Sequence, residues 1–283
     1  MDRLFRSWDL LERSFAILKS DKELLWLPVM SALYCLAAAL IIGSAAMITV
    51  VLPAMPLHDV AQRKALGQQL LPFGFLFYFV TYAVGIYFNV ALVSIASDRL
   101  AGGHATLKEG LQTAWQRKWS ILQWALLAAT VGVLLQMVEQ RLSFIGRIVT
   151  RITGYVWTLA SFFVVPVLAA EDMGPGEALF ESAEIFRKTW GEEVAGSFSF
   201  GLISVVLALP GLLFPVLGAR LGQTEMLAGV ALMVIYWMLL ALVCSAARGI
   251  FVAALYRYAN TQEVSGGFDR NDLSRAWQRK SSY

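Results

Sequence analysis

Long uninterrupted apolar runs alternate with short polar stretches along the whole chain. Six runs contain no charged residue: 24–57, 65–97, 119–138, 152–170, 194–219 and 226–247. Each is close to or longer than the roughly 20 residues that cross a bilayer as a helix. The runs lack the alternation of a barrel strand, and only helices or closed barrels satisfy the backbone in lipid. The pattern therefore predicts an all-α, polytopic membrane protein with six transmembrane helices.

Prolines lie inside or at the edge of several apolar runs. Pro28, Pro166, Pro210 and Pro215 are the positions at which we expect these helices to bend. Proline lacks the backbone N–H and its ring collides with the carbonyl one turn earlier, so it interrupts a helix.

Three of the polar stretches resemble one another. Segments 12–26, 107–124 and 180–194 each combine an apolar face with Trp, Lys or Arg, and each leads into an apolar run. Thr106 and Glu109 have the spacing of a capping box at the start of the second segment. The pattern predicts three elbow-helix/span/span repeats at about 7–98, 105–171 and 175–258. They form one membrane domain over 1–258, followed by a basic cytoplasmic tail over 259–283.

The elbow segments carry residues that favour the membrane interface. We expect them to anchor there through one set of side chains: Trp26, Trp119, Trp190, Arg187 and Lys188. Tryptophan and long basic side chains are enriched at this depth. The alternative is that these segments are ordinary helices of cytoplasmic loops.

Positive charge divides unequally between the two sides of the predicted bundle. Sixteen Lys and Arg residues lie on the side of the two termini: Arg3, Arg6, Arg13, Lys19, Lys22, Arg99, Lys108, Arg117, Lys118, Arg187, Lys188, Arg257, Arg270, Arg275, Arg279 and Lys280. Six lie on the other side: Arg63, Lys64, Arg141, Arg147, Arg151 and Arg220. The positive-inside rule then places both termini in the cytoplasm.

Composition agrees with the membrane interpretation and narrows the chemistry. The chain is 58% hydrophobic and 15% charged, with a mean hydropathy of +0.63. A net charge of +3 gives no reason to expect nucleic-acid binding. Two cysteines and two histidines do not supply a metal cluster, and hydrolase, nucleotide-binding and zinc-protease motifs are absent. We therefore expect no enzyme activity, no metal and no cofactor.

Two polar residues lie inside predicted spans at matching distances from the inner end. Asn89 precedes Asp98 by nine residues, and Arg248 precedes Arg257 by nine. They are the candidate intramembrane polar site, with the guanidinium donating to the amide oxygen. In the alternative, Arg248 extends to the inner headgroups and Asn89 bonds a neighbouring backbone group.

Three segments resemble a known group of proteins. They are "SWDLLERSFAILKSDKELLWLP" (7–28), "WALLAATVGVLL" (124–135) and "FFVVPVLAAEDMGPGEALFESAEIFRKTWGE" (162–192). The chain resembles a family of uncharacterised bacterial six-span membrane proteins, a domain of unknown function. The last segment is also distantly similar to the membrane domain found in some glycerophosphodiester phosphodiesterases. The resemblance implies a multi-pass protein of the bacterial inner membrane and no particular chemistry.

Three functional classes remain, the third being a lipid-handling protein that would bind headgroups between the elbow helices. The first is an oligomeric channel or transport-type protein, whose repeats would surround a polar path. The second is a non-enzymatic scaffold or regulator that engages membrane lipids, anionic ones included, or partner proteins through the elbow helices and tail. The small number of ionisable residues within the spans disfavours an ion-coupled transporter. We expect a homo-oligomer, since a pore can form between subunits.

Overall fold

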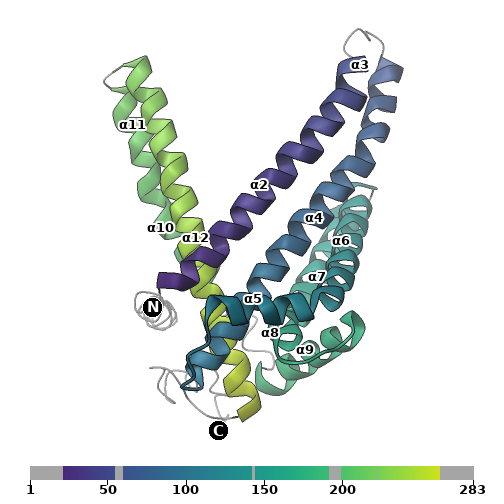
Figure 1. Cartoon of the computed structure of the whole chain (residues 1–283). Coiled ribbons are helices and arrows are strands. Elements are labelled where there is room, and N and C mark those ends of the chain that lie inside the picture. The colour runs from purple at the N-terminus through teal and green to yellow at the C-terminus, as the bar shows by residue number, and fades with distance from the viewer. Residues whose placement is uncertain (1–21, 55–59, 142–143, 191–198, 221, 262–283) are drawn as a thin grey trace. The chain divides into compact units, whose positions relative to one another are not determined.

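The structure is a computed structural model that describes residues 22–54, 60–141, 144–190, 199–220 and 222–261 (Figure 1). The described chain consists of helices and short connections and contains no strand. Five of its helices are long and apolar enough to cross a membrane: Glu23–Val51, Leu66–Leu100, Lys118–Glu139, Val149–Ala170 and Gln223–Arg257. The all-α prediction is confirmed.

The residues divide into two compact groups. The central unit combines Val29–Ala91 with Leu111–Ala183. The flanking unit combines the chain up to Pro28 with Leu92–Gly110 and the chain from Glu184 onward. Several helices pass from one unit into the other. The single domain over 1–258 stays a prediction.

The central unit begins with a helical hairpin. A 3-10 turn, η1 (Lys22–Leu25), leads into α2 (Trp26–Ala46), which continues through a π-helical turn over Met47–Val51 into α3 (Leu52–Ala54). The returning helix is α4 (Val60–Leu100). Cys35 and Tyr34 of α2 contact Thr81 and Phe88 of α4, with a Sγ to carbonyl distance of 3.7 Å and a ring separation of 5.7 Å. These contacts pack the predicted first and second spans against each other.

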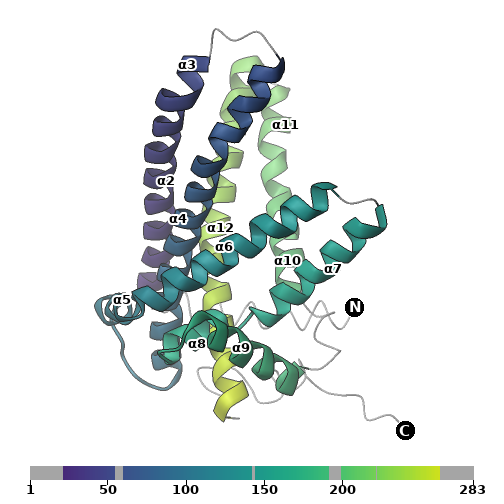
Figure 2. The same ribbon diagram turned by 90° about the vertical axis from the view of Figure 1, so that its right-hand side faces the viewer.

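A second hairpin completes the central unit. Helix α5 (Leu107–Gln116) precedes α6 (Lys118–Arg141), and α7 (Phe144–Ala160) returns beside α6 (Figure 2). The rings of Trp124 and Trp157 stack between α6 and α7 at 5.6 Å. After a turn, α8 (Val164–Ala170) continues the span, and α9 (Pro175–Trp190) follows as the next amphipathic helix.

The break between α7 and α8 has an identifiable cause. Pro166 is the third residue of α8, and its ring excludes the helical carbonyl of Phe162 one turn earlier. The interruption therefore falls at 161–163, just before the predicted bend. Because the helical hydrogen bonds stop at this turn, the Phe163 N–H has no acceptor in its own helix. It donates instead to the hydroxyl of Ser182 in α9 at 2.9 Å.

The flanking unit contains the last two apolar runs. Helix α10 (Ser199–Ala208), a 3-10 turn η4 (Leu209–Leu212) and α11 (Leu213–Ala219) form one interrupted arm along α12 (Gln223–Thr261) (Figures 1 and 2). Tyr236 and Trp237 of α12 donate to the carbonyls of Leu207 and Ala208, at 2.6 and 3.0 Å. The apolar helical part of this arm, Ser204–Ala219, is shorter than the five candidate spans. Six spans therefore stay a prediction.

The prolines behave according to their place in each helix. Pro210 lies in η4 and Pro215 in the first turn of α11, where the arm is interrupted as predicted. Pro28 follows the change from the 3-10 turn η1 to α2, and the bend predicted there stays a prediction. Pro28 is the third residue of α2, and a first-turn proline costs no backbone hydrogen bond because that N–H has no helical acceptor.

The inner part of α12 packs against the end of α4. Ala246, Ile250 and Ala253 are buried, and a side chain at Gly249 would collide with Leu92. Arg257 donates to the carbonyl of Ser97 at 3.4 Å. Helix α12 runs to Thr261, beyond the predicted start of the tail at 259, and residues 262–283 lie outside the described residues.

Candidate functional site

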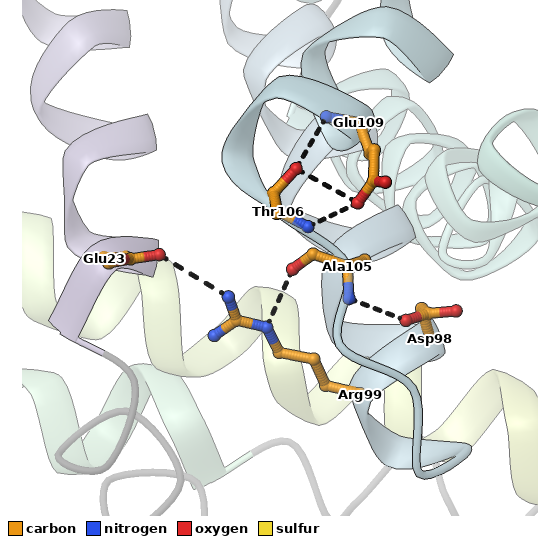
Figure 3. Close-up of polar contacts among 6 residues, drawn as sticks. All are labelled: Glu23, Asp98, Arg99, Ala105, Thr106 and Glu109. Carbon is orange, nitrogen blue, oxygen red and sulfur yellow. Dashed lines mark hydrogen bonds and ion pairs between the residues drawn. The ribbon is translucent and has the colours of Figure 1, made fainter.

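A dense polar turn joins the end of α4 to the start of α5 (Figure 3). The N–H groups of Gly102 and Gly103 donate to the carbonyls of Arg99 and Asp98, and Gly102 adopts a φ of 88°. This is the Schellman arrangement, in which a left-handed residue closes the helix end. The carboxylate of Asp98 then accepts the N–H of Ala105 at 2.9 Å, and Arg99 Nε donates to the carbonyl of Ala105 at 3.1 Å.

The predicted capping box is confirmed at the start of α5. The N–H of Thr106 donates to the Glu109 carboxylate at 2.7 Å, and the N–H of Glu109 donates to the Thr106 hydroxyl at 3.3 Å. The backbone N–H and then the hydroxyl of Thr106 lower the pKa of Glu109 below its ordinary 4.5, and desolvation opposes them. The reciprocal bonds satisfy N–H groups that have no helical partner.

Arginine side chains tie the ends of the predicted spans together. In the flanking unit Arg99 also pairs with Glu23 at 3.7 Å. In the central unit Arg117 donates to the carbonyl of Ala170 at 3.4 Å and pairs with Asp172 at 3.4 Å. A cation at a helix C-terminus is favourable because the last carbonyls lack helical donors. These groups have structural partners.

The predicted interfacial anchors are exposed wherever their side chains are described. Trp26 is 59% exposed and Trp119 is 67% exposed, and Arg187 is exposed as well. The ammonium of Lys118 lies 4.3 Å from the centre of the Trp115 ring. The side chains of Lys188 and Trp190 lie outside the described residues. The first elbow is also outside them up to residue 21, so interfacial anchoring stays a prediction.

Asn89 and Arg248 fall into different compact units. Asn89 is half-buried, and its amide nitrogen donates to the carbonyl of Gly85, one turn earlier in α4, at 3.0 Å. Arg248 is exposed on α12. This bond to its own helix agrees with the alternative, in which Asn89 bonds a neighbouring backbone group. The amide oxygen can still accept a hydrogen bond. The pairing of the two residues stays a prediction.

A polar face of α7 is a further candidate. Polar or small residues recur at intervals of three or four: Arg147, Arg151, Gly154 and Thr158. Such spacing places them on one side of a helix. Arg151 pairs with Glu139 of α6 at 3.2 Å. The charge pattern assigns Arg151 only to the outer side. The periodic spacing is the signal in the sequence that identifies the face.

Among the described residues, no cluster of three or more His, Cys, Asp or Glu side chains could hold a metal ion. Cys35 and Cys244 are free thiols.

These features indicate the class of protein. Five long apolar helices with largely exposed apolar side chains, joined by polar caps at their ends, are compatible with a helical membrane protein. The chain belongs to the DUF6159 family, a family of unknown function, whose model matches residues 70–267. No curated protein matches the chain. The resemblance to an uncharacterised family is thereby confirmed, and the likeness to phosphodiesterase membrane domains stays a prediction.

Proposed function

We propose that this chain is an integral protein of the bacterial inner membrane and works as an oligomeric channel or transport-type protein. It crosses the bilayer six times in three elbow-helix/span/span repeats, with both termini in the cytoplasm. The five candidate spans and the apolar arm along α12 support this count. The unequal distribution of Lys and Arg supports the orientation.

The interruption of the span formed by α7 and α8 carries the proposal. Irregular backbone at membrane depth is tolerated only where protein buries it or where it borders water. Transport proteins use such discontinuous helices near their binding sites. Here the irregular turn is held by a buried hydroxyl, since Ser182 and Phe163 are both 0% exposed. A simple membrane anchor has no need of this arrangement.

Exposed apolar surface supports assembly into a homo-oligomer. Within one copy of the chain, only 11% of the most apolar stretch of the α2 span is buried. For the α12 span the buried share is 6%. Lipid can cover such faces, and so can another subunit. Neither a catalytic reaction, a cofactor nor a nucleic acid is part of this proposal.

A scaffold or regulator is the second candidate. The exposed rings of Trp115 and Trp119, with the half-buried Lys118 over the Trp115 ring, favour it. Such a face suits the headgroup region and anionic lipid. In this case the elbows and tail would bind lipid or partner proteins, and no solute would cross.

Flux through reconstituted vesicles separates the two candidates. The purified full chain is incorporated into vesicles, its oligomeric state is determined by cross-linking, and release of chloride, potassium and small neutral solutes is compared with empty vesicles. Selective flux with an oligomeric protein supports the channel. An oligomer or monomer that passes none of these solutes contradicts it and leaves the scaffold.

A further inference from the structure

Helix α7 differs from the other described spanning helices. Its polar residues gather on one side as strongly as they do on the short elbow helix α5. Helices α2, α4, α6, α10 and α12 show no comparable segregation. A span surrounded only by lipid and apolar protein gains nothing from segregation, so one side of α7 meets a different environment.

The opposite side of α7 identifies which face meets lipid. It is entirely aliphatic: Ile148, Ile152, Val156 and Leu159. Ile152 is 59% exposed and Val156 is 57% exposed. The polar side is exposed too, at Arg151 and Thr158. Lipid satisfies the aliphatic side, whereas an exposed polar side at membrane depth requires water or protein.

The position of Thr158 sets the depth. The candidate span runs from Val149 to Ala170, and Thr158 lies nine residues from its start. At 1.5 Å per residue this is about 13 Å along the helix, close to the middle of a bilayer. The Thr158 hydroxyl donates to the carbonyl of Gly154 at 2.9 Å, which lowers the cost of this position without making it apolar.

Charge identifies the kind of solute. Arg151 lies two residues inside the start of the span, and its side chain is 76% exposed. The charged partner of Arg151 in the described chain is Glu139, at the end of the α6 span, with a side chain 39% exposed. The guanidinium of Arg151 is therefore the more exposed charge of this pair at the outer end of the face.

We propose that the polar face of α7 lines a water-filled path through the membrane and that Arg151 makes this path select small anions. The inference rests on the proposed channel function and deepens it, because it names the lining and the class of solute. Thr158 lines the path at mid-depth, and Glu139 moderates the charge of Arg151.

Cysteine reactivity tests the lining without requiring flux. In a chain carrying Cys35→Ala and Cys244→Ala, Thr158→Cys and Val156→Cys place one thiol on each side of the same helix at the same depth. A thiol in lipid has a raised pKa, and each unit removes tenfold of its reactive thiolate. Thr158→Cys should therefore react with an impermeant thiosulfonate at least about tenfold faster than Val156→Cys. Equal rates overturn the inference.

Depth distinguishes a path from a helix lying on the surface. A fluorophore attached to Val156→Cys should be quenched more by nitroxide placed deep in the acyl chains than by nitroxide at the headgroups. The reverse order would place α7 in the interface and overturn the inference, even with Thr158→Cys reactive.

Ion selectivity tests the role of Arg151. The chloride-to-potassium permeability ratio, taken from reversal potentials in the full-length protein, does not depend on the amount of folded protein. Arg151→Gln should lower this ratio, and Glu139→Gln should raise it, because its loss leaves the guanidinium unpaired. If the pair is only structural, the ratio does not change in opposite directions.

Failures of the two proposals are distinguishable. Wild-type vesicles without flux contradict the channel and the anion selectivity, while a faster-reacting Thr158→Cys would still establish the wet face. Wild-type vesicles with flux and equally slow thiols would retain the channel and reject α7 as its lining.

Discussion

At the scale of single residues, Ser182 shows how a span interruption is held. Its hydroxyl replaces the helical acceptor that the Phe163 N–H loses ahead of Pro166. Ser182→Ala leaves this buried donor unsatisfied, which costs about 1–3 kcal/mol. We expect a melting temperature lowered by several degrees in detergent. Ser44→Ala is the matched control, because this exposed serine bonds only its own helix. Equal effects of both substitutions would contradict the role of Ser182.

Glu109 makes the start of α5 sensitive to acid. Its pKa is lower in the folded protein than the ordinary 4.5, so its stabilisation is present above pH 4.5 and is lost as the pH falls through the lowered value. Amide exchange at the start of α5, corrected for intrinsic rates, should accelerate in this acidic range. Glu109→Gln keeps the capping geometry and should remove the pH dependence. An unchanged acid response in this variant would assign it to another group.

Arg248 and Asn89 distinguish a polar interior from a charge that reaches the headgroups. If Arg248 only extends to the interface, Arg248→Lys should behave like wild type, because lysine also reaches that depth. If it binds Asn89 through its planar guanidinium, both Arg248→Lys and Arg248→Leu should impair flux. Arg248→Leu combined with Asn89→Leu should then cost less than the sum of the single variants. Additive and silent substitutions in an active preparation would exclude both residues.

At the scale of elements, local signals predict the structure well and long-range contacts do not follow from them. The apolar runs place α2, α4, α6 and α12, and Thr106 with Glu109 places the start of α5. The bond from Phe163 to Ser182 joins a span to an elbow, and no local spacing indicates it. The break falls before Pro166, because proline has no N–H to donate to the carbonyl one turn earlier and its ring collides with that carbonyl. The polar residues of α7 recur periodically in the sequence. Counting Lys and Arg on each side of the membrane does not reveal this pattern.

Glycines allow the arm and α12 to approach closely. A Cβ at Gly229 would collide with the backbone of Phe214, and one at Gly218 would collide with the backbone of Glu225. Gly229→Ala should therefore separate the helices and cost about 1–3 kcal/mol, measured as a lower melting temperature. Gly43→Ala is the control, since nothing lies within 4 Å of the added Cβ, and it should be neutral or stabilising by up to about 1 kcal/mol. A destabilised Gly43→Ala with an unaffected Gly229→Ala would contradict this packing.

At the scale of the whole molecule, the number of crossings decides the account. The interrupted arm over 199–219 pairs with α12, and six spans follow only if this arm crosses the bilayer as well. A five-span chain would place its two ends on opposite sides of the membrane. The positive-inside rule instead predicts both ends on the cytoplasmic side. The proposed path and its solute depend on this arrangement.

Cysteine labelling of intact cells tests the topology most directly. Single cysteines replace Gln68, Gln112, Gln223 and Ser282 in a chain carrying Cys35→Ala and Cys244→Ala. We predict that an impermeant thiol reagent added outside the inner membrane labels the thiols at 68 and 223, and that those at 112 and 282 react only after the membrane is opened. Labelling at 282 without labelling at 223 would show five crossings and would contradict the account.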